Sequence, residues 1–310
     1  MLQPASVPLA HTETLDARYT DLDIWPTGTV LEALLESQLG AVAAVKSALP
    51  QLEAAITAAV PRLEAGGRLF YVGAGTSGRI GLQDGVELIP TYGWPADRLV
   101  LMLAGGDAAL FNPVEGAEDD EAEARRAINA HAPTAQDVVI GVAASGGTPY
   151  TCAALETAKG AGSLCIGMSC SPNTRLLNTE YPVLIQTGPE VVAGSTRMKA
   201  GTAQKVTLNL LSTTLMIRLG HTWRGQMVDM RIVNAKLVRR AHRMLRHLTG
   251  CTQAQAEDAL QHANGSIKLA VLLRHGLDVP QARQLLTLCG GHLRKALARI
   301  AAKTPAEASA

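Results

Sequence analysis

The spacing of hydrophobic residues changes twice along the chain. After a polar, irregular stretch over residues 1–26, two segments keep a helical spacing. The first places four leucines on one helical face: Leu31, Leu34, Leu35 and Leu39. The second, which Gly66-Gly67 ends, does the same with Leu52, Ile56, Val60 and Leu63. The chain therefore opens with two amphipathic helices.

Short apolar runs of strand length come next. They occur at residues 69–72, 99–103, 138–142, 164–168 and 183–185. Helix-length segments separate most of these runs, and strands that alternate with helices indicate crossover connections and a parallel sheet. We predict an α/β fold with a doubly wound, five-stranded parallel sheet. Ligands of such sheets bind beyond the carboxyl ends of the strands.

The last third of the chain is helical again. Two long helices, interrupted near residues 220–225, are expected between residues 194 and 248. Shorter helices follow, with start signals at Thr252 and Asp278. We divide the chain into an N-terminal segment and helix (1–48), a sheet domain with long helices (49–248), a small UBA-like helical bundle (249–298) and a tail (299–310).

Composition narrows the class of protein. The 310 residues are 47% hydrophobic and 18% charged, which is typical of a globular protein. The formal net charge of +1 gives no bulk attraction to nucleic acid or to an acidic membrane. The basic stretch over residues 231–246 is best explained as the solvated face of a helix. We expect neither nucleic acid nor a membrane as a partner.

The cysteines indicate a reducing compartment. There are five, an odd number, and no two of them have the Cys-x-x-Cys spacing. The first 12 residues lack the pattern of a signal peptide, and no apolar run is long enough to span a bilayer. We expect a cytoplasmic protein without disulfides. No Cys/His cluster suggests a metal, and no cofactor is implied.

Two loops combine glycines with hydroxyls where a strand ends and a helix begins. Residues 73–79 follow the first strand and offer Gly75, Thr76 and Ser77. Free amides and the helix dipole favour a phosphate at such a position. This loop lacks the lysine of a nucleotide P-loop, and on its own it could equally be a tight turn.

The second loop, residues 143–148, follows the third strand and offers Ser145, Gly146 and Thr148. Ser145 or Thr148 could simply cap a helix. Two such loops at neighbouring strand ends suggest instead one hydroxyl-rich pocket for a phosphate.

A third polar segment, residues 188–205, leads into an otherwise apolar helix. Ser195 and Thr196 could cap that helix, whereas the dipole opposes Lys199 in its first turn. A bound anion would offset this repulsion. The segment adds four candidate substrate-binding residues: Glu190, Ser195, Thr196 and Lys199.

Together the three loops resemble the sugar isomerase (SIS) domain family. The match is more specific for the N-acetylmuramic acid 6-phosphate etherases within it, over residues 12–298. It is carried by Thr12-Glu13 and by residues 73–79, 87–93 (Glu-Leu-Ile-Pro-Thr-Tyr-Gly), 115–120 and 194–205. Glucokinase regulatory protein shares the last block but has two such domains per chain.

This resemblance implies a carbon–oxygen lyase that acts on a ring-opened sugar phosphate. A base removes the proton alpha to the aldehyde, D-lactate leaves from the neighbouring carbon, and water adds back. By position, Glu87 corresponds to the proton donor for lactate and Glu118 to the base. One carboxyl must stay protonated while the other is ionised, so their surroundings must differ.

Residue patterns alone support the two glutamates unequally. Glu118 lies in the acidic run 115–123, which from sequence alone is better explained as the negative first turn of a helix. Glu87 lies in an apolar stretch, where a carboxylate must be compensated or used. With the resemblance included, we assign both to catalysis.

The distance between Glu87 and Ser77 raises a difficulty. If Ser77 opens a helix, Glu87 lies ten residues further on, which is about 15 Å along the axis. A hexose phosphate does not reach that far. Either the helix breaks at Gly85, or Glu87 serves the pocket of a second subunit. Because SIS domains commonly pair, we expect a homodimer with shared active sites.

Some positions depart from the etherase pattern. Gly147 stands where arginine is usual, and residues 36–39 (Glu-Ser-Gln-Leu) stand near a segment that is usually more acidic. Because the phosphate loops and both glutamates are present, sugar-phosphate binding should be barely affected, whereas exact substrate choice and full activity stay open. The main alternative is a non-catalytic, sugar-phosphate-sensing regulatory protein, against which the paired glutamates argue. An aldose–ketose isomerase would share the loops but would need no acid for a leaving ether.

Overall fold

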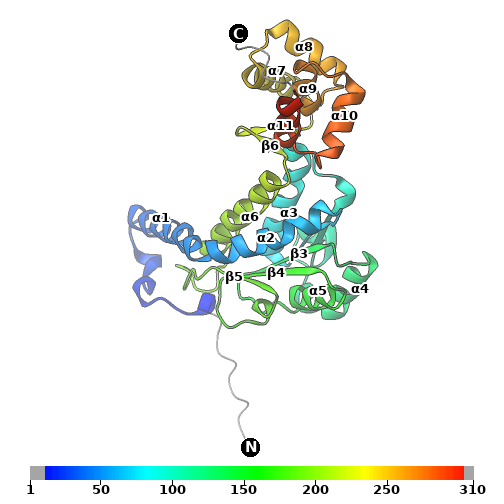
Figure 1. Ribbon diagram of the computed structural model, residues 1–310. Coiled ribbons are helices and arrows are strands. Elements are labelled where there is room, and N and C mark those ends of the chain that lie inside the picture. The colour runs from blue at the N-terminus through cyan, green and yellow to red at the C-terminus, as the bar shows by residue number, and fades with distance from the viewer. Residues whose placement is uncertain (1–10, 304–310) are drawn as a thin grey trace, which may run out of the picture. The chain divides into compact units, whose positions relative to one another are not determined.

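The computed structural model describes residues 11–303 (Figure 1). Its strands are β1 (Leu69–Gly73), β2 (Leu99–Leu103), β3 (Val138–Ala143), β4 (Leu164–Ser169), β5 (Tyr181–Leu184), β6 (Thr222–Trp223) and β7 (Gln226–Met227). Its α-helices are α1 (Thr27–Ala44), α2 (Leu49–Glu64), α3 (Gly75–Tyr92), α4 (Glu121–Ala130), α5 (Pro149–Gly160), α6 (Lys199–Arg218), α7 (Ala235–Thr249), α8 (Gln253–His262), α9 (Ile267–Arg274), α10 (Val279–Leu288) and α11 (Leu293–Lys303). Short 3-10 helices connect several of them.

The predicted parallel sheet is confirmed. Its strand order is β2-β1-β3-β4-β5, and Leu69 of β1 pairs with both Leu99 and Val138. Helix α2 covers one face, and α4 and α5 cover the other (Figure 1). The chain proceeds from β1 to β2 on one side and returns to β3 on the other. The strand order therefore reverses between β1 and β3, which makes this the switch point of the sheet.

The strands are apolar throughout because both faces of the sheet are covered. Side chains of β1 alternate between the faces. Phe70 and Val72 belong to the core with α4 and α5, whereas the Tyr71 hydroxyl donates to Asp84 of α3 at 3.0 Å. All three β1 side chains are buried. Because of this alternation, β1 contacts α4 and α5 through Phe70 and Val72 on one face of the sheet and contacts α3 through Tyr71 on the other.

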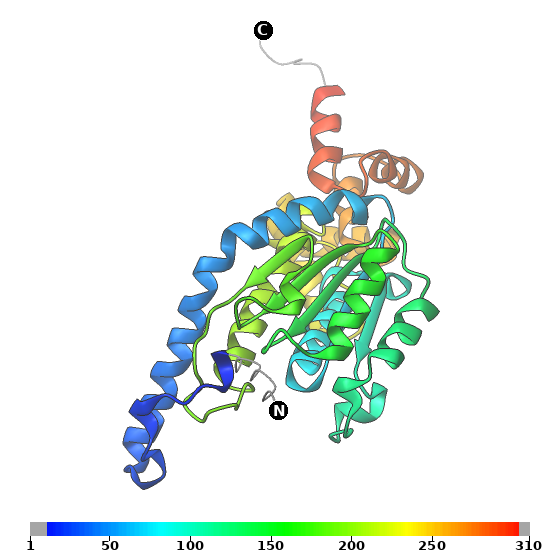
Figure 2. The ribbon, with the colours of Figure 1, turned by 90° about the horizontal axis from the view of Figure 1, so that it is seen from below.

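Helix α1 differs from the helices that pack on the sheet. It continues through a short 3-10 turn into α2 and extends beyond the edge of the sheet (Figure 2). The face predicted from its leucines is exposed, with Leu31, Leu35 and Leu39 at 62%, 62% and 64% of full exposure. The amphipathic pattern therefore lacks an apolar partner within the described part of the chain.

By length and composition alone, the helical stretch Thr27–Glu64 could cross a membrane, which corrects the expectation that no run was long enough. The reason is the apolar character of α1. A single helix of this kind is weak evidence, because a leucine-rich helix that packs against protein passes the same test.

The chain forms two compact units. One comprises Met1–Gly85 and Asp97–Ser212 and holds the sheet; the other comprises Val86–Ala96 and Thr213–Ala310. Helices α3 and α6 each contribute to both. Helix α7 thus belongs to the same compact unit as the small helices, whereas its place in the sequence had predicted the sheet domain. The division of the chain into domains stays a prediction, with the segments 1–48, 49–248, 249–298 and 299–310.

The pattern on α7 explains this grouping. Its buried residues recur at the spacing of one helical face: Ala241, Met244, Leu245 and Leu248. They belong to one apolar core with α8 and α9, while Arg239, Arg243 and Arg246 are exposed. The basic stretch is therefore a solvated helix face, as predicted.

Several local predictions are refined by the structure. The helix starts predicted at Thr252 and Asp278 are confirmed, and each has a capping box. The interruption after α6 is filled by the β6–β7 hairpin. Helix α11 continues to Lys303, so residues 299–303 are helical rather than part of a tail. Residues 1–10 and 304–310, with most of the stretch tested for a signal peptide, lie outside the described residues.

A buried ion pair ties the starts of the two central strands together. Asp137 precedes β3, is 1% exposed, and accepts hydrogen bonds from the Arg68 backbone (2.8 Å), the Arg68 guanidinium (2.7 Å) and the Thr134 backbone (2.8 Å). Burial raises the pKa of Asp137, but the bonds from Arg68 and Thr134 outweigh it, so this pKa lies below its ordinary value.

We expect Asp137→Asn to lower the free energy of unfolding by about 2 kcal/mol at neutral pH. Because the folded pKa is lowered, this contribution is complete above the unfolded pKa of about 3.9 and is lost as the pH falls through the folded value. The difference from the natural protein should therefore be constant above about pH 5 and shrink below about pH 4. Urea unfolding across this range measures it.

The exposed Asp107→Asn is the matched control and should change stability little at any pH. A destabilisation by Asp137→Asn that keeps its full size in acid would show that its charge is not what holds the strand starts.

Candidate functional site

A cavity of about 600 Å³ lies beyond the carboxyl ends of β1 and β3, at the switch point of the sheet. Five hydroxyl side chains line it: Thr76, Ser77, Ser145, Thr148 and Thr196. Three carboxylates also line it: Glu13, Glu118 and Asp119. The two predicted phosphate loops thus meet in one pocket, as expected from their places after neighbouring strands.

The loop after β1 is held tight by glycines. A Cβ added to Gly73 would lie 2.7 Å from the Cα of Gly78, so the backbone can turn directly from strand into α3. Gly75 lines the cavity and adopts a positive φ of 51°. Ser77 sits in the first turn of α3, 8% exposed, with its Oγ 3.0 Å from Oε1 of Gln204.

The loop after β3 presents its hydroxyls differently. Thr148 is the N-cap residue of α5, yet its side chain makes no capping hydrogen bond and is available to a ligand. Ser145 Oγ accepts a weak bond from the Gly147 backbone at 3.3 Å. Gly146, predicted to bind substrate, does not line the cavity. It has a φ of 69°, and a Cβ there would lie 2.2 Å from Thr174 Oγ1, so its role is to shape the turn.

The segment before α6 carries its own anion. The carboxylate of Glu190, 1% exposed, accepts hydrogen bonds from the backbones of Lys199 and Ala200, each at 2.9 Å. Glu190 therefore caps α6, and the interpretation of Ser195 or Thr196 as the cap is wrong. Its negative charge is what offsets the cation in the first turn.

Three predicted binding residues of this segment do not line the cavity: Glu190, Ser195 and Lys199. Lys199 donates from Nζ to the Pro189 carbonyl at 3.0 Å, and burial lowers the pKa of Lys199. Thr196 does line the cavity. The structure thus brings one of the four residues to the pocket.

Glu118 lies where a catalytic carboxylate could act. It is exposed on a short 3-10 helix, Ala117–Asp119, and lines the cavity. The acidic run also contains the helix start that the sequence suggested, because Asp120 caps α4 by accepting from the Glu123 backbone at 2.8 Å. That explanation holds for α4 from Asp120 onward, whereas Glu118 lies before α4, in the first turn of its own 3-10 helix.

Glu87 is not buried in an apolar environment within one chain. It is exposed on α3, where Leu88 is 2% exposed and Val86 is 46% exposed. Successive residues on a helix point in different directions, so an apolar stretch need not bury each member. Helix α3 runs unbroken from Gly75 to Tyr92, so of the two alternatives the break at Gly85 is wrong. Glu87 belongs to the second compact unit and does not line the cavity.

Glu13 and Asp119 also line the cavity, although neither was predicted to belong to the site. The Thr12 carbonyl accepts from the Gly194 backbone at 3.3 Å, which places Glu13 beside the segment before α6. The Thr12-Glu13 pair could have indicated that Glu13 belongs to the site, but it supported only the family resemblance. No lysine, arginine or histidine is among the described residues that line the cavity. Within residues 11–303, no group of three or more His, Cys, Asp or Glu could hold a metal ion.

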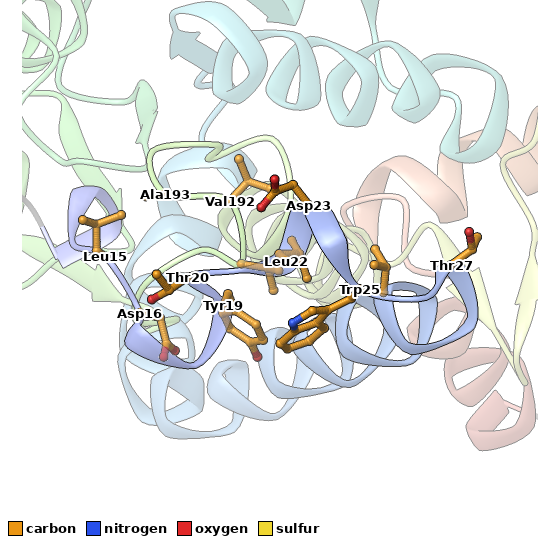
Figure 3. A pocket seen from close by; sticks show the side chains of 12 residues that line it. Leu15, Asp16, Tyr19, Thr20, Leu22, Asp23, Trp25, Thr27, Val192 and Ala193 are labelled. Atoms are coloured by element: carbon orange, nitrogen blue, oxygen red, sulfur yellow. The ribbon is translucent and has the colours of Figure 1, made fainter.

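A second cavity, of about 660 Å³, is chemically different (Figure 3). The N-terminal segment and residues 191–193 form it, with Tyr19 and Trp25 beside each other, ring centroids 6.2 Å apart. Aliphatic side chains make up much of its wall. Asp16, at its rim, already pairs with Arg18. Its two threonines are Thr20, which donates to the Ala17 carbonyl, and Thr27, which starts α1, so it has fewer hydroxyls than the first cavity.

The sheet and its cavity define a protein of the SIS class. Residues 51–159 match the model of the glucokinase regulatory protein N-terminal SIS domain, and residues 224–268 match that protein's C-terminal lid domain. A solved phosphoheptose isomerase from Francisella tularensis is 18% identical, with a TM-score of 0.46 over 63% of this chain and 98% of its own.

Curated relatives narrow the class. The N-acetylmuramic acid 6-phosphate etherase of Deinococcus radiodurans is 50% identical over 93% of this chain and 95% of its own. That of Rhizobium rhizogenes is 42% identical over 91% and 92%. The chain belongs to the N-acetylmuramic acid 6-phosphate etherase family, which confirms the resemblance drawn from its motifs.

We expect Ser77→Ala to weaken the binding of inorganic phosphate by about ten-fold or more, because a hydrogen bond to a charged group contributes roughly 1.5–3 kcal/mol. Calorimetric titration measures the Kd. Ser163→Ala is the control, since Ser163 is also buried but donates to the Thr134 carbonyl, before β3. Equal phosphate affinity in the two variants would remove Ser77 from the pocket.

Proposed function

We propose that this protein cleaves the D-lactyl ether of N-acetylmuramic acid 6-phosphate, giving N-acetylglucosamine 6-phosphate and D-lactate by elimination and hydration. It would serve the recycling of cell-wall sugars in the cytoplasm. The observation that carries the proposal is the hydroxyl-lined cavity with Glu118 on its wall, in a chain 50% identical to an etherase. Five free, buried cysteines fit a reducing compartment.

The phosphate is held by neutral donors. Ser77, Ser145, Thr148 and Thr196 supply hydroxyls, and α3 and α5 begin at the cavity wall with Gly75 and Pro149. Pro149 has no backbone N–H, so the free amides of α5 begin at Tyr150. Helix N-termini favour anions through these amides and through the helix dipole. Binding therefore does not need a lysine or arginine from the cavity wall. Glu190 and Lys199 support this site indirectly by fixing the start of α6.

The reaction needs a base and an acid. Glu118 removes the proton from the carbon alpha to the aldehyde, and the electron pair of that C–H bond forms a carbon–carbon double bond. The neighbouring C–O bond breaks as Glu87 gives its proton to the departing lactate oxygen. Water then adds across the double bond. An ether oxygen leaves slowly unless it is protonated, which is why two carboxyls in different states are required.

A homodimer with shared active sites accounts for the position of Glu87. On the unbroken α3, Glu87 lies about 15 Å along the axis from Ser77, too far for a hexose phosphate bound at its own helix start. The exposed leucines of α1 offer an apolar surface for a second copy. In the proposed dimer, Ser77 and Glu118 of one subunit act with Glu87 of the other, and no cofactor takes part.

The activity can be tested directly. Purified protein incubated with N-acetylmuramic acid 6-phosphate, without added metal or nucleotide, should release D-lactate and N-acetylglucosamine 6-phosphate in equal amounts. Glu118→Gln prepared in the same way controls for contaminating enzymes. Intact binding of the sugar phosphate without lactate release would instead favour a regulatory sensor.

The two glutamates should fail differently. In deuterated water, Glu87→Gln should still exchange the alpha proton of the sugar but release lactate at least 100-fold more slowly, because it lacks the acid. Glu118→Gln should lose both exchange and release, because it lacks the base. Proton NMR of the sugar and an assay for lactate separate the two steps. Exchange in Glu118→Gln but not in Glu87→Gln would reverse the roles.

The shared site predicts complementation. Mixing inactive Glu87→Gln with inactive Glu118→Gln should restore part of the activity, because one of the two pockets in each mixed dimer then has both native glutamates. Subunit exchange is confirmed independently with differently tagged chains. Mixed dimers without activity would place Glu87 in the pocket of its own chain.

A further inference from the structure

Behind Ser77 lies a buried amide to which no role has been given. Gln204 of α6 is 0% exposed, and its Oε1 lies 3.0 Å from Ser77 Oγ. Its Nε2 is also buried and has no hydrogen-bond partner among the described residues. A buried amide nitrogen without a partner costs about 1–3 kcal/mol. A group of this kind next to a ligand-binding hydroxyl calls for a physical explanation.

The direction of the hydrogen bond between the two residues decides what Ser77 can offer a ligand. A serine hydroxyl has one proton and two lone pairs. If Ser77 donates to Oε1 of Gln204, only lone pairs remain for the cavity, and these repel a phosphate oxygen. The two amide protons of Gln204 then also stay unpaired.

The opposite orientation of the amide removes the first problem and half of the second: one amide proton stays unpaired, and Oε1 takes the buried place of Nε2. The two ends of a glutamine amide have nearly the same shape, so the hydrogen-bond network decides which end meets Ser77. With Nε2 beside Ser77 Oγ, Gln204 donates and a serine lone pair accepts. One previously unpaired donor is satisfied, and the proton of Ser77 is free to point into the cavity.

We infer that Gln204 is a positioning residue: it donates from Nε2 to Ser77 Oγ and thereby directs the Ser77 proton at the phosphate. This inference rests on the proposed phosphate pocket. Gln204 does not line the cavity and acts only through Ser77. The neighbouring Thr207 shows the contrast, because its buried hydroxyl donates to the Ala203 carbonyl within α6 at 2.7 Å and has no link to the cavity.

The first test replaces the amide with an apolar side chain of similar length. Gln204→Met should raise the Kd of inorganic phosphate and the KM for N-acetylmuramic acid 6-phosphate by about three- to ten-fold, the worth of one neutral hydrogen bond. The kcat should change much less, because the reacting glutamates are untouched. Thr207→Val, a loss of one buried polar group on the same helix, should change neither constant.

A double variant separates positioning from general structural damage. If Gln204 acts through Ser77, Ser77→Ala combined with Gln204→Met should bind phosphate no worse than Ser77→Ala alone. Independent, additive losses would overturn the inference, as would unchanged phosphate affinity in Gln204→Met. If Ser77→Ala itself leaves phosphate binding unchanged, the proposed pocket fails first, so the two failures are distinguishable.

Gln204→Glu tests the direction of the hydrogen bond, and it also serves if the methionine variant does not fold. An ionised carboxylate can only accept, so it should take the Ser77 proton and weaken phosphate binding more than methionine does. A protonated carboxyl can donate again. The ratio of the Kd of this variant to that of the natural protein should therefore fall as the pH is lowered. A ratio that is close to one, or that does not change with pH, would overturn the inference.

Discussion

The close approach of two glycines after β1 is the constraint on which the site depends. A Cβ at Gly73 would come within 2.7 Å of Gly78, so only glycines allow α3 to begin directly at the end of the strand. Ser77 lies between them and is held against the cavity wall. The same turn directs the first amides of α3 toward the switch point between β1 and β3. The close packing of Gly73 against Gly78 therefore determines the positions of both the Ser77 hydroxyl and the positive end of the α3 dipole.

The charges around this turn are separated by role. Neutral hydroxyls line the cavity together with the carboxylates of Glu13, Glu118 and Asp119, and no described cation lines it. A lysine or arginine there would pair with a carboxylate and compete with its use in proton transfer. The cation and anion nearest the start of α6, Lys199 and Glu190, instead bond to backbone groups. These bonds fix the shape of the segment before α6, and neither charged group lines the cavity.

The unbroken α3 decides what Glu87 can do. A helix that starts at the phosphate loop carries every later residue away from it at a fixed rise, so Glu87 cannot serve a ligand at its own helix start. Glu87 and the α1 leucines are both exposed in a single chain, and the proposed dimer uses both observations. Both are surfaces that a second subunit would use. The proposed chemistry and the proposed dimer therefore depend on each other.

The sequence by itself determined the five strands, the two glycine- and hydroxyl-rich loops and the family, because these depend on local period, on glycines at tight turns and on short motifs. Tertiary structure alone decided that Glu190, rather than Ser195 or Thr196, caps α6, and that Asp137 joins Arg68 from 69 residues away. It also decided that α7 packs with the small helices and that Glu87 is exposed. These outcomes depend on which side chains meet across the fold, and no local period encodes the direction in which a helix presents one residue to a distant element.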